Sequence, residues 1–208
     1  MPETIGYKQV CGMLNAATDQ IRKHHEVLSK LDSAVGDGDH GTTILRAMEA
    51  VSKTVSEHPG ADLKTLFSAI AWAIMSCDGG STGPLLGSFF MGMSDGAAGR
   101  GELDCPAMVS VFEGGVAKLQ KQSRAQVGDK TMMDAFLPAL AALKLTESRG
   151  IKAALEQAAE AAAKGAEATR NMKAKFGRAR NLGDRVLGHV DPGAVSVSLI
   201  FKGFSKGL

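Results

Sequence analysis

Apolar residues recur three and four positions apart along most of this 208-residue chain, a spacing that places them on one face of an α-helix. The pattern predicts helices over residues 4–31, 42–55, 63–77, 84–98 and 105–122. We expect another helix from about Thr131. Nine alanines among residues 153–168 favour one more, because alanine is the best helix former.

The segment 193–204 can be interpreted in two ways. Val195, Val197, Leu199 and Phe201 alternate with smaller or polar residues, as in a strand, but an isolated strand would have no partner. The chain is also short enough for one domain. We therefore expect one all-α domain over residues 1–208, with about eight helices.

Charge and cysteine content exclude several classes of protein. Twenty-four basic and 22 acidic residues give a net charge of +2, too small for binding nucleic acid by basic charge alone. No run of 18 apolar residues exists that would cross a membrane. The start of the chain lacks a signal peptide, and the three cysteines form no Cys-x-x-Cys pair. We expect a cytoplasmic protein without a zinc site.

Glycine is frequent, with 25 residues, and much of the excess lies in polar loops. The first loop, residues 31–43, contains Asp32, Asp37 and Asp39. Carboxylates are ligands that Mg²⁺ and Ca²⁺ prefer, although an exposed turn is the alternative. Three acids in one loop would repel one another without a cation, which favours the metal. An EF-hand is excluded because Met48 stands at its twelfth position, counted from Asp37.

Two further loops carry residues that suit phosphate. Residues 77–84 combine glycines with Ser81 and Thr82, which would hold a phosphate or simply cap a helix. The arginine-rich segment 176–185 would pair with phosphate or serve as a connector. The Gly-Asp-Lys-Thr segment at 128–131 is not a Walker A motif.

Some apolar residues outside these loops have simpler interpretations. We expect Trp72, Phe89 and Phe90 to lie in the core. Gly87 and Gly92 interrupt a helical pattern, and close packing of helices is our hypothesis for them.

Taken together, these motifs resemble the L subunit of the dihydroxyacetone kinase family. The resemblance rests on Leu31-Asp32-x4-Asp37-Gly38-Asp39-His40-Gly41, Gly79–Pro84, Gly128–Met132, Gly177-Arg178-Ala179, Leu182–Arg185 and Gly188–Ala194, and it covers about the whole chain. It implies a barrel of eight antiparallel amphipathic helices, with a nucleotide site in the loops at one end. Position by position, it implies metal ligands at Asp32, Asp37 and Asp39. The implied nucleotide contacts are His40, Gly41, Thr42, Thr43, Ser81, Thr82, Ser123, Met132, Arg178, Asp191, Pro192 and Gly193.

The resemblance also implies a phosphotransferase that holds ADP or ATP with two Mg²⁺ ions. The keto-sugar is expected on a separate K subunit, bound covalently by a histidine of that partner, so no catalytic residue is assigned to this chain. In one branch of the family a phosphotransferase-system protein rephosphorylates a retained ADP, and in the other ATP exchanges. Thr43, Ser123, Arg180 and Asn181 depart from the bacterial phosphotransferase-system pattern, and the sugar, the donor and the oligomeric state stay open.

Two other functions remain as alternatives. The first is a non-catalytic regulatory module of the same fold, which binds nucleotide without transferring phosphate. The second is a metal-dependent phosphohydrolase that acts without a partner.

Overall fold

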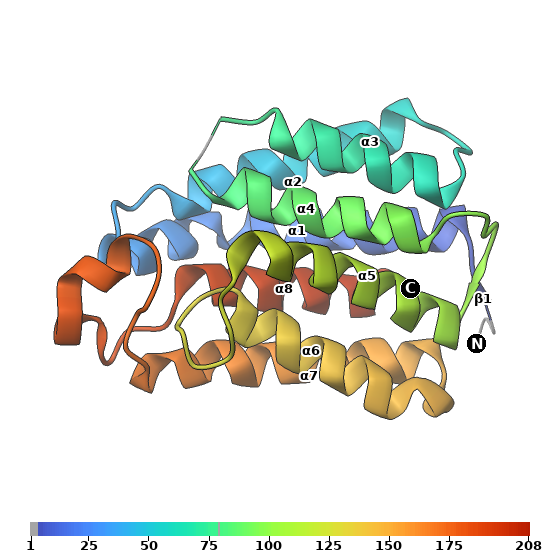
Figure 1. The fold of residues 1–208 in the computed structure, drawn as a ribbon. Helices are drawn as coiled ribbons and strands as arrows, with labels where there is room; N and C mark the ends of the chain where they lie inside the picture. The colour runs from blue at the N-terminus through green and yellow to red at the C-terminus, as the bar shows by residue number, and fades with distance from the viewer. Residues whose placement is uncertain (1–3, 79) are drawn as a thin grey trace.

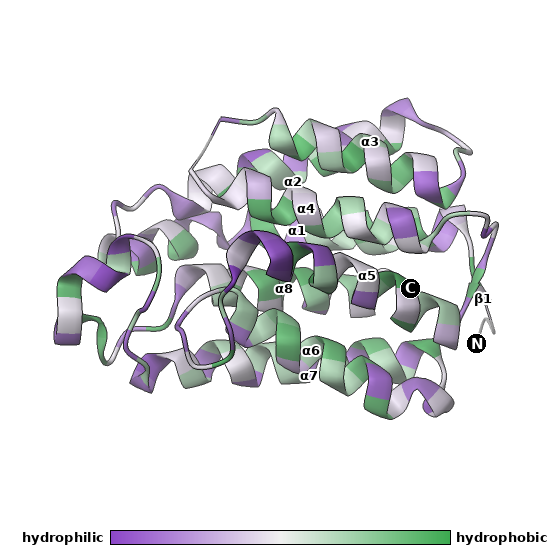
Figure 2. Ribbon diagram, viewed as in Figure 1, coloured by the Kyte–Doolittle hydropathy of each residue, from purple (hydrophilic) through white to green (hydrophobic). Residues whose placement is uncertain are grey.

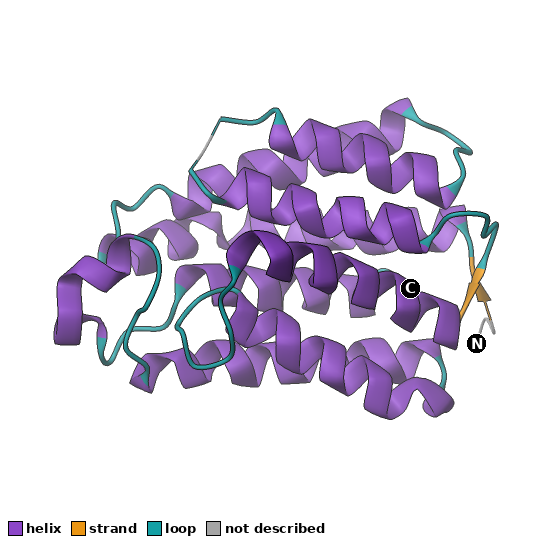
Figure 3. Cartoon of the chain, viewed as in Figure 1, coloured by secondary structure: helices purple, strands orange, loops and turns teal. Residues whose placement is uncertain are grey.

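The structure is a computed structural model that describes residues 4–78 and 80–208. Within these residues the chain forms eight α-helices, and successive helices run in opposite directions (Figure 1, Figure 3). Their bounds are Tyr7–Ser33 (α1), His40–Glu57 (α2), Leu63–Met75 (α3), Thr82–Gly96 (α4), Cys105–Ser123 (α5), Met133–Thr146 (α6), Ile151–Ala168 (α7) and Pro192–Lys206 (α8). Three 3-10 helices lie in the connections, at Glu147–Arg149, Thr169–Asn171 and Arg178–Val186.

The helices close into a ring. Each packs against the next one in sequence, and α8 packs against α1. Glycines make the closure tight, because a Cβ at Gly12 in α1 would collide with the carbonyl oxygen of Gly207 after α8. The predicted all-α barrel of eight helices is confirmed. None of the helices in the described residues is both long enough and apolar enough to cross a membrane.

The strand interpretation of residues 193–204 is wrong, because this segment forms most of α8. Asp191 caps the helix by accepting a hydrogen bond from the Ala194 amide, and Pro192 occupies the first turn, where it costs no hydrogen bond. Val197, Phe201 and Phe204 then follow with helical spacing and are buried. A short antiparallel pair that the sequence did not predict joins Thr4–Ile5 (β1) to Leu103–Asp104 (β2).

The core is apolar and rich in phenylalanine. Phe89, Phe112, Phe136 and Phe201 contact one another across the barrel with ring centroids 4.8–6.2 Å apart. Figure 2 shows that the helices carry both hydrophobic and hydrophilic positions, as amphipathic helices around one core should. Phe89 and Phe90 are fully buried as predicted, but Trp72 lies on the outside of α3 with 62% of its surface exposed, so its placement in the core is wrong.

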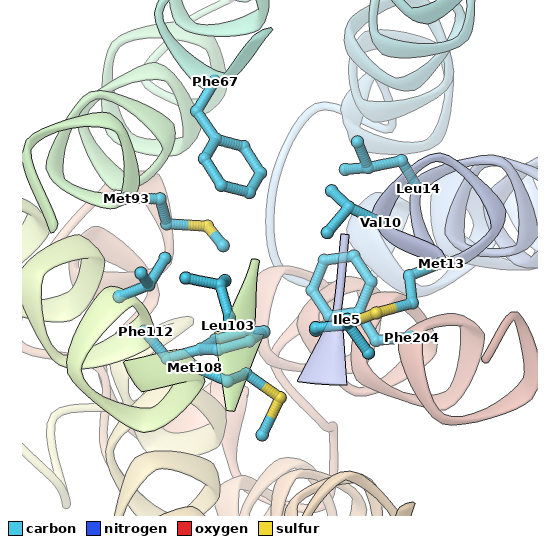
Figure 4. A pocket seen from close by; sticks show the side chains of 11 residues that line it. Ile5, Val10, Met13, Leu14, Phe67, Met93, Leu103, Met108, Phe112 and Phe204 are labelled. Atoms are coloured by element: carbon cyan, nitrogen blue, oxygen red, sulfur yellow. The ribbon is translucent and has the colours of Figure 1, made fainter. Parts of the chain in front are cut away.

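A small apolar cavity lies at the end of the core near β1 and β2 (Figure 4). It measures about 20 Å³, and residues such as Met13, Leu103, Met108 and Phe204 line it. These side chains offer no polar group to hold a water molecule. The cavity is a packing gap where short strands meet the helices.

Glycines allow α4 to approach both α5 and α3 closely. A Cβ at Gly92 would collide with the carbonyl oxygen of Gly114, and a Cβ at Gly87 would collide with the Met75 side chain. The hypothesis that these two glycines serve close packing is confirmed.

The alternation of the helices separates the connections into two groups. Helices α2, α4, α6 and α8 all begin at one end of the barrel, and α1, α3, α5 and α7 end there (Figure 1). The connections at this end are residues 34–39, 76–81, 124–132 and 169–191. They include the four polar motifs that the sequence singled out.

Candidate functional site

The four connections surround a cavity of about 610 Å³. It is lined by most of the residues that the sequence predicted for a nucleotide and metal site. These are Asp32, Asp37, Asp39, His40, Thr43, Ser81, Thr82, Ser123, Met132, Arg178, Asp191, Pro192 and Gly193. The predicted residues Gly41 and Thr42 do not line it. What the lining residues bind stays a prediction.

The three predicted metal ligands converge. One carboxylate oxygen from each of Asp32, Asp37 and Asp39 lies within 4.8 Å of the others. Asp32 belongs to the last turn of α1 rather than to the loop where the sequence placed it. It is 9% exposed and accepts a hydrogen bond from the His40 amide at 3.2 Å. Three converging carboxylates with open faces are a donor set that fits Mg²⁺.

Arg178 reaches this acidic cluster from another connection that lines the cavity. It belongs to the long connection between α7 and α8, and its guanidinium forms an ion pair with Asp37. Both side chains are solvent-accessible. The arginine-rich segment is therefore more than a distant connector, because it places a cation beside the acids.

The first turn of α2 serves the cavity in some positions and helix packing in others. The His40 ring hydrogen-bonds Ser196 Oγ at 3.1 Å, and burial lowers the pKa of His40, which keeps the imidazole neutral. Thr43 is buried and lines the cavity, whereas Thr42 points to solvent. A Cβ at Gly41 would collide with the backbone of α1 at His25, so this glycine permits the close crossing of the two helices.

The start of α4 forms another wall. Ser81 is exposed and does not cap the helix with its side chain, which removes the simple capping interpretation for that residue. Thr82 is buried and lines the cavity. Gly79 lies outside the described residues. Both hydroxyls stand where the free amides of a helix begin, an arrangement suited to phosphate.

The cavity is also lined by residues that the sequence did not predict for the site, among them Lys130 and Thr131. Lys130 is 2% exposed and has a φ of 60°, a left-handed conformation that residues other than glycine seldom adopt. Its ammonium is bonded to backbone carbonyls of the connection between α7 and α8. A signal was present in the Gly-Asp-Lys-Thr segment, which supported the family resemblance and failed the Walker A pattern but was not assigned a site residue at Lys130 or Thr131.

Asp191 lines the cavity and has an unusual charge state. Its Oδ2 accepts the Ala194 amide at 2.7 Å, and its own amide donates to Thr169 Oγ1 at 2.8 Å. Burial raises the pKa of Asp191 to about 7, although the Ala194 amide and Lys130 oppose the shift. Close to neutral pH, this carboxyl group is partly protonated.

The site as a whole favours anions. Four helices begin at its wall, so the partial positive charges of their N-termini lie around it. No N-cap side chain caps α2 or α4, which leaves amides of their first turns available to a ligand, whereas Thr131 and Asp191 already accept amides of α6 and α8. The carboxylate cluster on one wall favours a cation. A metal-bound polyphosphate is a ligand that satisfies both demands.

Comparison with known proteins agrees with the family resemblance seen in the sequence motifs. The model of the DAK2 domain matches residues 34–206. The ADP-binding subunit DhaL of the PEP-dependent dihydroxyacetone kinase 1 of Listeria innocua is 35% identical over 90% of both chains. The corresponding subunit of Escherichia coli is 31% identical over 93% of both chains, and that of the PTS-dependent kinase of Lactococcus lactis is 36% identical over 91% of both.

A solved structure has the same fold. The dihydroxyacetone kinase of C. freundii in complex with AMP-PNP and Mg²⁺ matches with a TM-score of 0.76 and 29% identity. The match covers 96% of this chain but 34% of that one, so the chain corresponds to about a third of that protein. The motifs, the helical barrel and these matches agree, and the chain belongs to the DAK2 domain family.

Proposed function

We propose that the chain, as a single domain over residues 1–208, is the nucleotide-binding subunit of a dihydroxyacetone kinase or of a related keto-sugar kinase. One observation carries the proposal: the carboxylates of Asp32, Asp37 and Asp39 converge at the wall of a cavity that faces four helix N-termini. This arrangement supports binding of ADP or ATP together with two Mg²⁺ ions. The names of the DhaL relatives and the AMP-PNP and Mg²⁺ of the C. freundii structure support the same ligand class.

The residues of the chain would divide the work as follows. The three aspartates hold the metal, and bound Mg²⁺ supplies positive charge that neutralises the phosphates and the leaving group. The amides at the starts of α2 and α4, with Thr43, Ser81 and Thr82, would fix the phosphate oxygens. Arg178 would exchange its ion pair with Asp37 for one with a phosphate, because a guanidinium pairs with a carboxylate or with a phosphate.

The starts of α6 and α8 suit the nucleoside. Gly193 lies beside Met132, since an added Cβ would be in van der Waals contact with the Met132 Cβ at 3.6 Å and would crowd Asp191 Oδ2 at 3.0 Å. Met132 and Pro192 are apolar and almost fully buried, and they would pack against a base while excluding water. Ser123, which is partly exposed, would contribute at the edge.

We place the acceptor hydroxyl and the residues that activate it on a partner, a K-type sugar-binding subunit, and assign no nucleophile or base to this chain. The naming of relatives as subunits of PEP-dependent and PTS-dependent kinases supports a phosphotransferase-system donor that rephosphorylates bound ADP. We also propose a cytoplasmic location, following the cysteine pattern of the sequence.

Calorimetry on purified chain, stripped of bound nucleotide with EDTA, tests the proposal. We expect ADP to bind with Mg²⁺ and to bind poorly without it. Mass spectrometry of nucleotide retained through purification then separates the two branches, since retained ADP favours the coenzyme role and rapid ATP turnover with a K subunit favours exchange. No binding of MgADP by the stripped, folded chain contradicts the proposal. Binding without phosphorylation in the presence of a K subunit would favour a non-catalytic regulatory module, and phosphate release without any partner would favour a phosphohydrolase.

A further inference from the structure

The connection between α7 and α8 is long, and it carries Arg178 to the cavity. It leaves the barrel at Thr169 and returns at Asp191, and between these points it contains two 3-10 helices and no α-helix. Arg170 ties its two ends together, because the Arg170 carbonyl accepts the Gly188 amide and its guanidinium donates to the Gly188 carbonyl, both at 2.9 Å. A segment with so little internal structure needs such attachments to hold a side chain in place.

A single buried ammonium group joins both ends of this connection. Lys130 Nζ donates to the carbonyl of Thr169 at 2.6 Å and also to the carbonyl of His189. Thr169 closes the connection a second time, because its hydroxyl accepts the Asp191 amide. Hydrogen bonds from a buried charge are strong, and burying an ammonium without them costs free energy of folding. Moving either end of the connection away would therefore remove one of the two carbonyl acceptors of the Lys130 ammonium.

The turn that presents Lys130 is built around Asp134. The carboxylate of Asp134 is fully buried and accepts the amides of Gly128 at 2.6 Å and Thr131 at 2.8 Å. These bonds hold the turn in the shape that gives Lys130 its left-handed backbone. Backbone strain of this kind persists where the surroundings over-determine it, which is common at functional sites.

The same turn has a second attachment to the connection. Asp129 accepts the Lys175 amide at its carbonyl at 3.2 Å, and its carboxylate pairs with the Lys175 ammonium at 2.6 Å. The 128–131 turn thus holds the connection at both ends and at a point close to Arg178.

We propose that Lys130 is a positioning residue, which holds the two ends of the 169–191 connection together so that Arg178 stands over the carboxylate cluster. The inference rests on the proposed function, because Arg178 is there assigned to a phosphate. Lys130 acts through backbone carbonyls and so through the connection.

Direct contact between Lys130 and a phosphate is the competing role, since the side chain lines the cavity. The bonding pattern disfavours it. The ammonium already donates hydrogen bonds to two carbonyls. Burial lowers the pKa of Lys130, and the nearby carboxyl groups of Asp191 and Asp134 oppose that shift by favouring the charged form. A phosphate would have to compete with all of these groups.

The test compares Lys130→Met with wild type and with Lys173→Met. Methionine keeps the length of the aliphatic part of the side chain and removes the ammonium. Lys173 is a matched control because its ammonium lies in the same connection but pairs with Asp184 at the exposed surface. Hydrogen exchange is measured along the whole chain with and without MgADP, and MgADP affinity is measured by calorimetry.

We expect Lys130→Met to speed exchange at least tenfold in residues 170–190 while α1–α6 keep wild-type protection. We expect its MgADP affinity to fall about tenfold, as loss of one charge-assisted contact would cause, and bound nucleotide to protect the connection less than in wild type. Lys173→Met should match wild type in both measurements. If Lys130→Met does not fold, Lys130→Gln, which retains a donor, should give the same pattern with a smaller change.

Other outcomes overturn the inference. Weaker MgADP binding with unchanged exchange in 170–190 would show direct contact with phosphate, and faster exchange along the whole chain would show a general loss of stability. Faster exchange in the connection with unaltered affinity would show that the nucleotide does not need it. Failure of the wild-type chain to bind MgADP would overturn the proposed function, yet the exchange measurement would still decide whether Lys130 holds the connection.

Discussion

Among the three clustered carboxylates, Asp39 has the smallest part in the fold. Its side chain precedes α2 without capping it, whereas Asp32 bonds the His40 amide and Asp37 pairs with Arg178. We expect Asp39→Asn to leave the helical content intact and to weaken Mg²⁺-dependent ADP binding at least tenfold, about 1.4 kcal/mol, because one ionised ligand is lost. Calorimetry at fixed Mg²⁺ measures the effect.

Asp184→Asn is the matched control for Asp39→Asn. This aspartate lies at the surface and pairs with Lys173 outside the cavity lining. The Asp184→Asn variant should bind MgADP with the affinity of wild type. Equal affinities in the two variants would count against a metal role for Asp39.

Asp191 should make the stability of the protein depend on pH. Because burial raises its pKa to about 7 in the folded state, the folded protein holds a proton that the unfolded chain releases near pH 4. The stability of wild type should therefore fall as the pH rises from about 4 to about 7 and stay low above that. Asparagine keeps the capping hydrogen bond to Ala194 and removes the titration.

Urea denaturation of wild type and Asp191→Asn at pH 5 and pH 8 measures this dependence. We expect the stability of wild type relative to the variant to be lower at pH 8, by one to a few kcal/mol at about 1.4 kcal/mol per pKa unit. Titrations of all other groups largely cancel in the comparison. A difference that is the same at both pH values would contradict the shift.

Single residues show how far the sequence alone could go. Asp32, Asp37 and Asp39 were identified from charge and glycine content, and the structure brings them together. Trp72 was wrongly placed in the core, because helical spacing does not say which face of an outer helix is covered. Lys130 was overlooked because its burial depends on carbonyls 39 and 59 positions away in the chain.

At the scale of helices, α4 and α5 are in contact through glycine. Gly92→Ala would add a methyl group against the carbonyl of Gly114, and the reciprocal contact is also close, with a Cβ at Gly114 only 2.8 Å from the Gly92 carbonyl. Alanine favours the helix by about 1 kcal/mol over glycine, but the collision with rigid backbone should outweigh that gain. We expect a net loss of about 1–3 kcal/mol, seen as a lower Tm.

Gly101→Ala provides the comparison for Gly92→Ala. A Cβ at Gly101 would have no atom within 4 Å, and its backbone is outside the left-handed region. The Tm of this variant should be unchanged or slightly raised, because alanine restricts the unfolded chain. If both variants behaved alike, the α4–α5 contact would not be as close as the structure has it.

The elements themselves were largely predictable. Five helices lie close to the residue ranges that apolar spacing indicated, and α7 follows the alanine-rich segment. In α8 a mixture of β-branched and small residues obscured the helical period, and the cap at Asp191 decided the outcome. The β1–β2 pair could not be predicted, since two strands of two residues carry no periodicity.

For the whole molecule, ligand binding should appear as thermal stability. A ligand that binds the folded barrel at 100 times its Kd adds about 2.7 kcal/mol. At this chain length that corresponds to a rise in Tm of about 5–10 °C. We expect this rise with ADP and Mg²⁺ together, a much smaller one with ADP and EDTA, and at most about half of it with the Asp39→Asn variant at the same ligand concentration. Equal shifts with and without Mg²⁺ would argue against a metal-bound nucleotide.

The contact of Gly12 with Gly207 has a consequence for connectivity. It brings the last turn of the barrel against the second turn of α1, at the end away from the 610 Å³ cavity (Figure 1). A short linker could therefore join the two chain ends, and new ends could be opened in the exposed 98–102 connection at the same end of the barrel. Such a circular permutant should assemble the same ring of helices, since the order in which the helices are synthesised does not determine which neighbours they have.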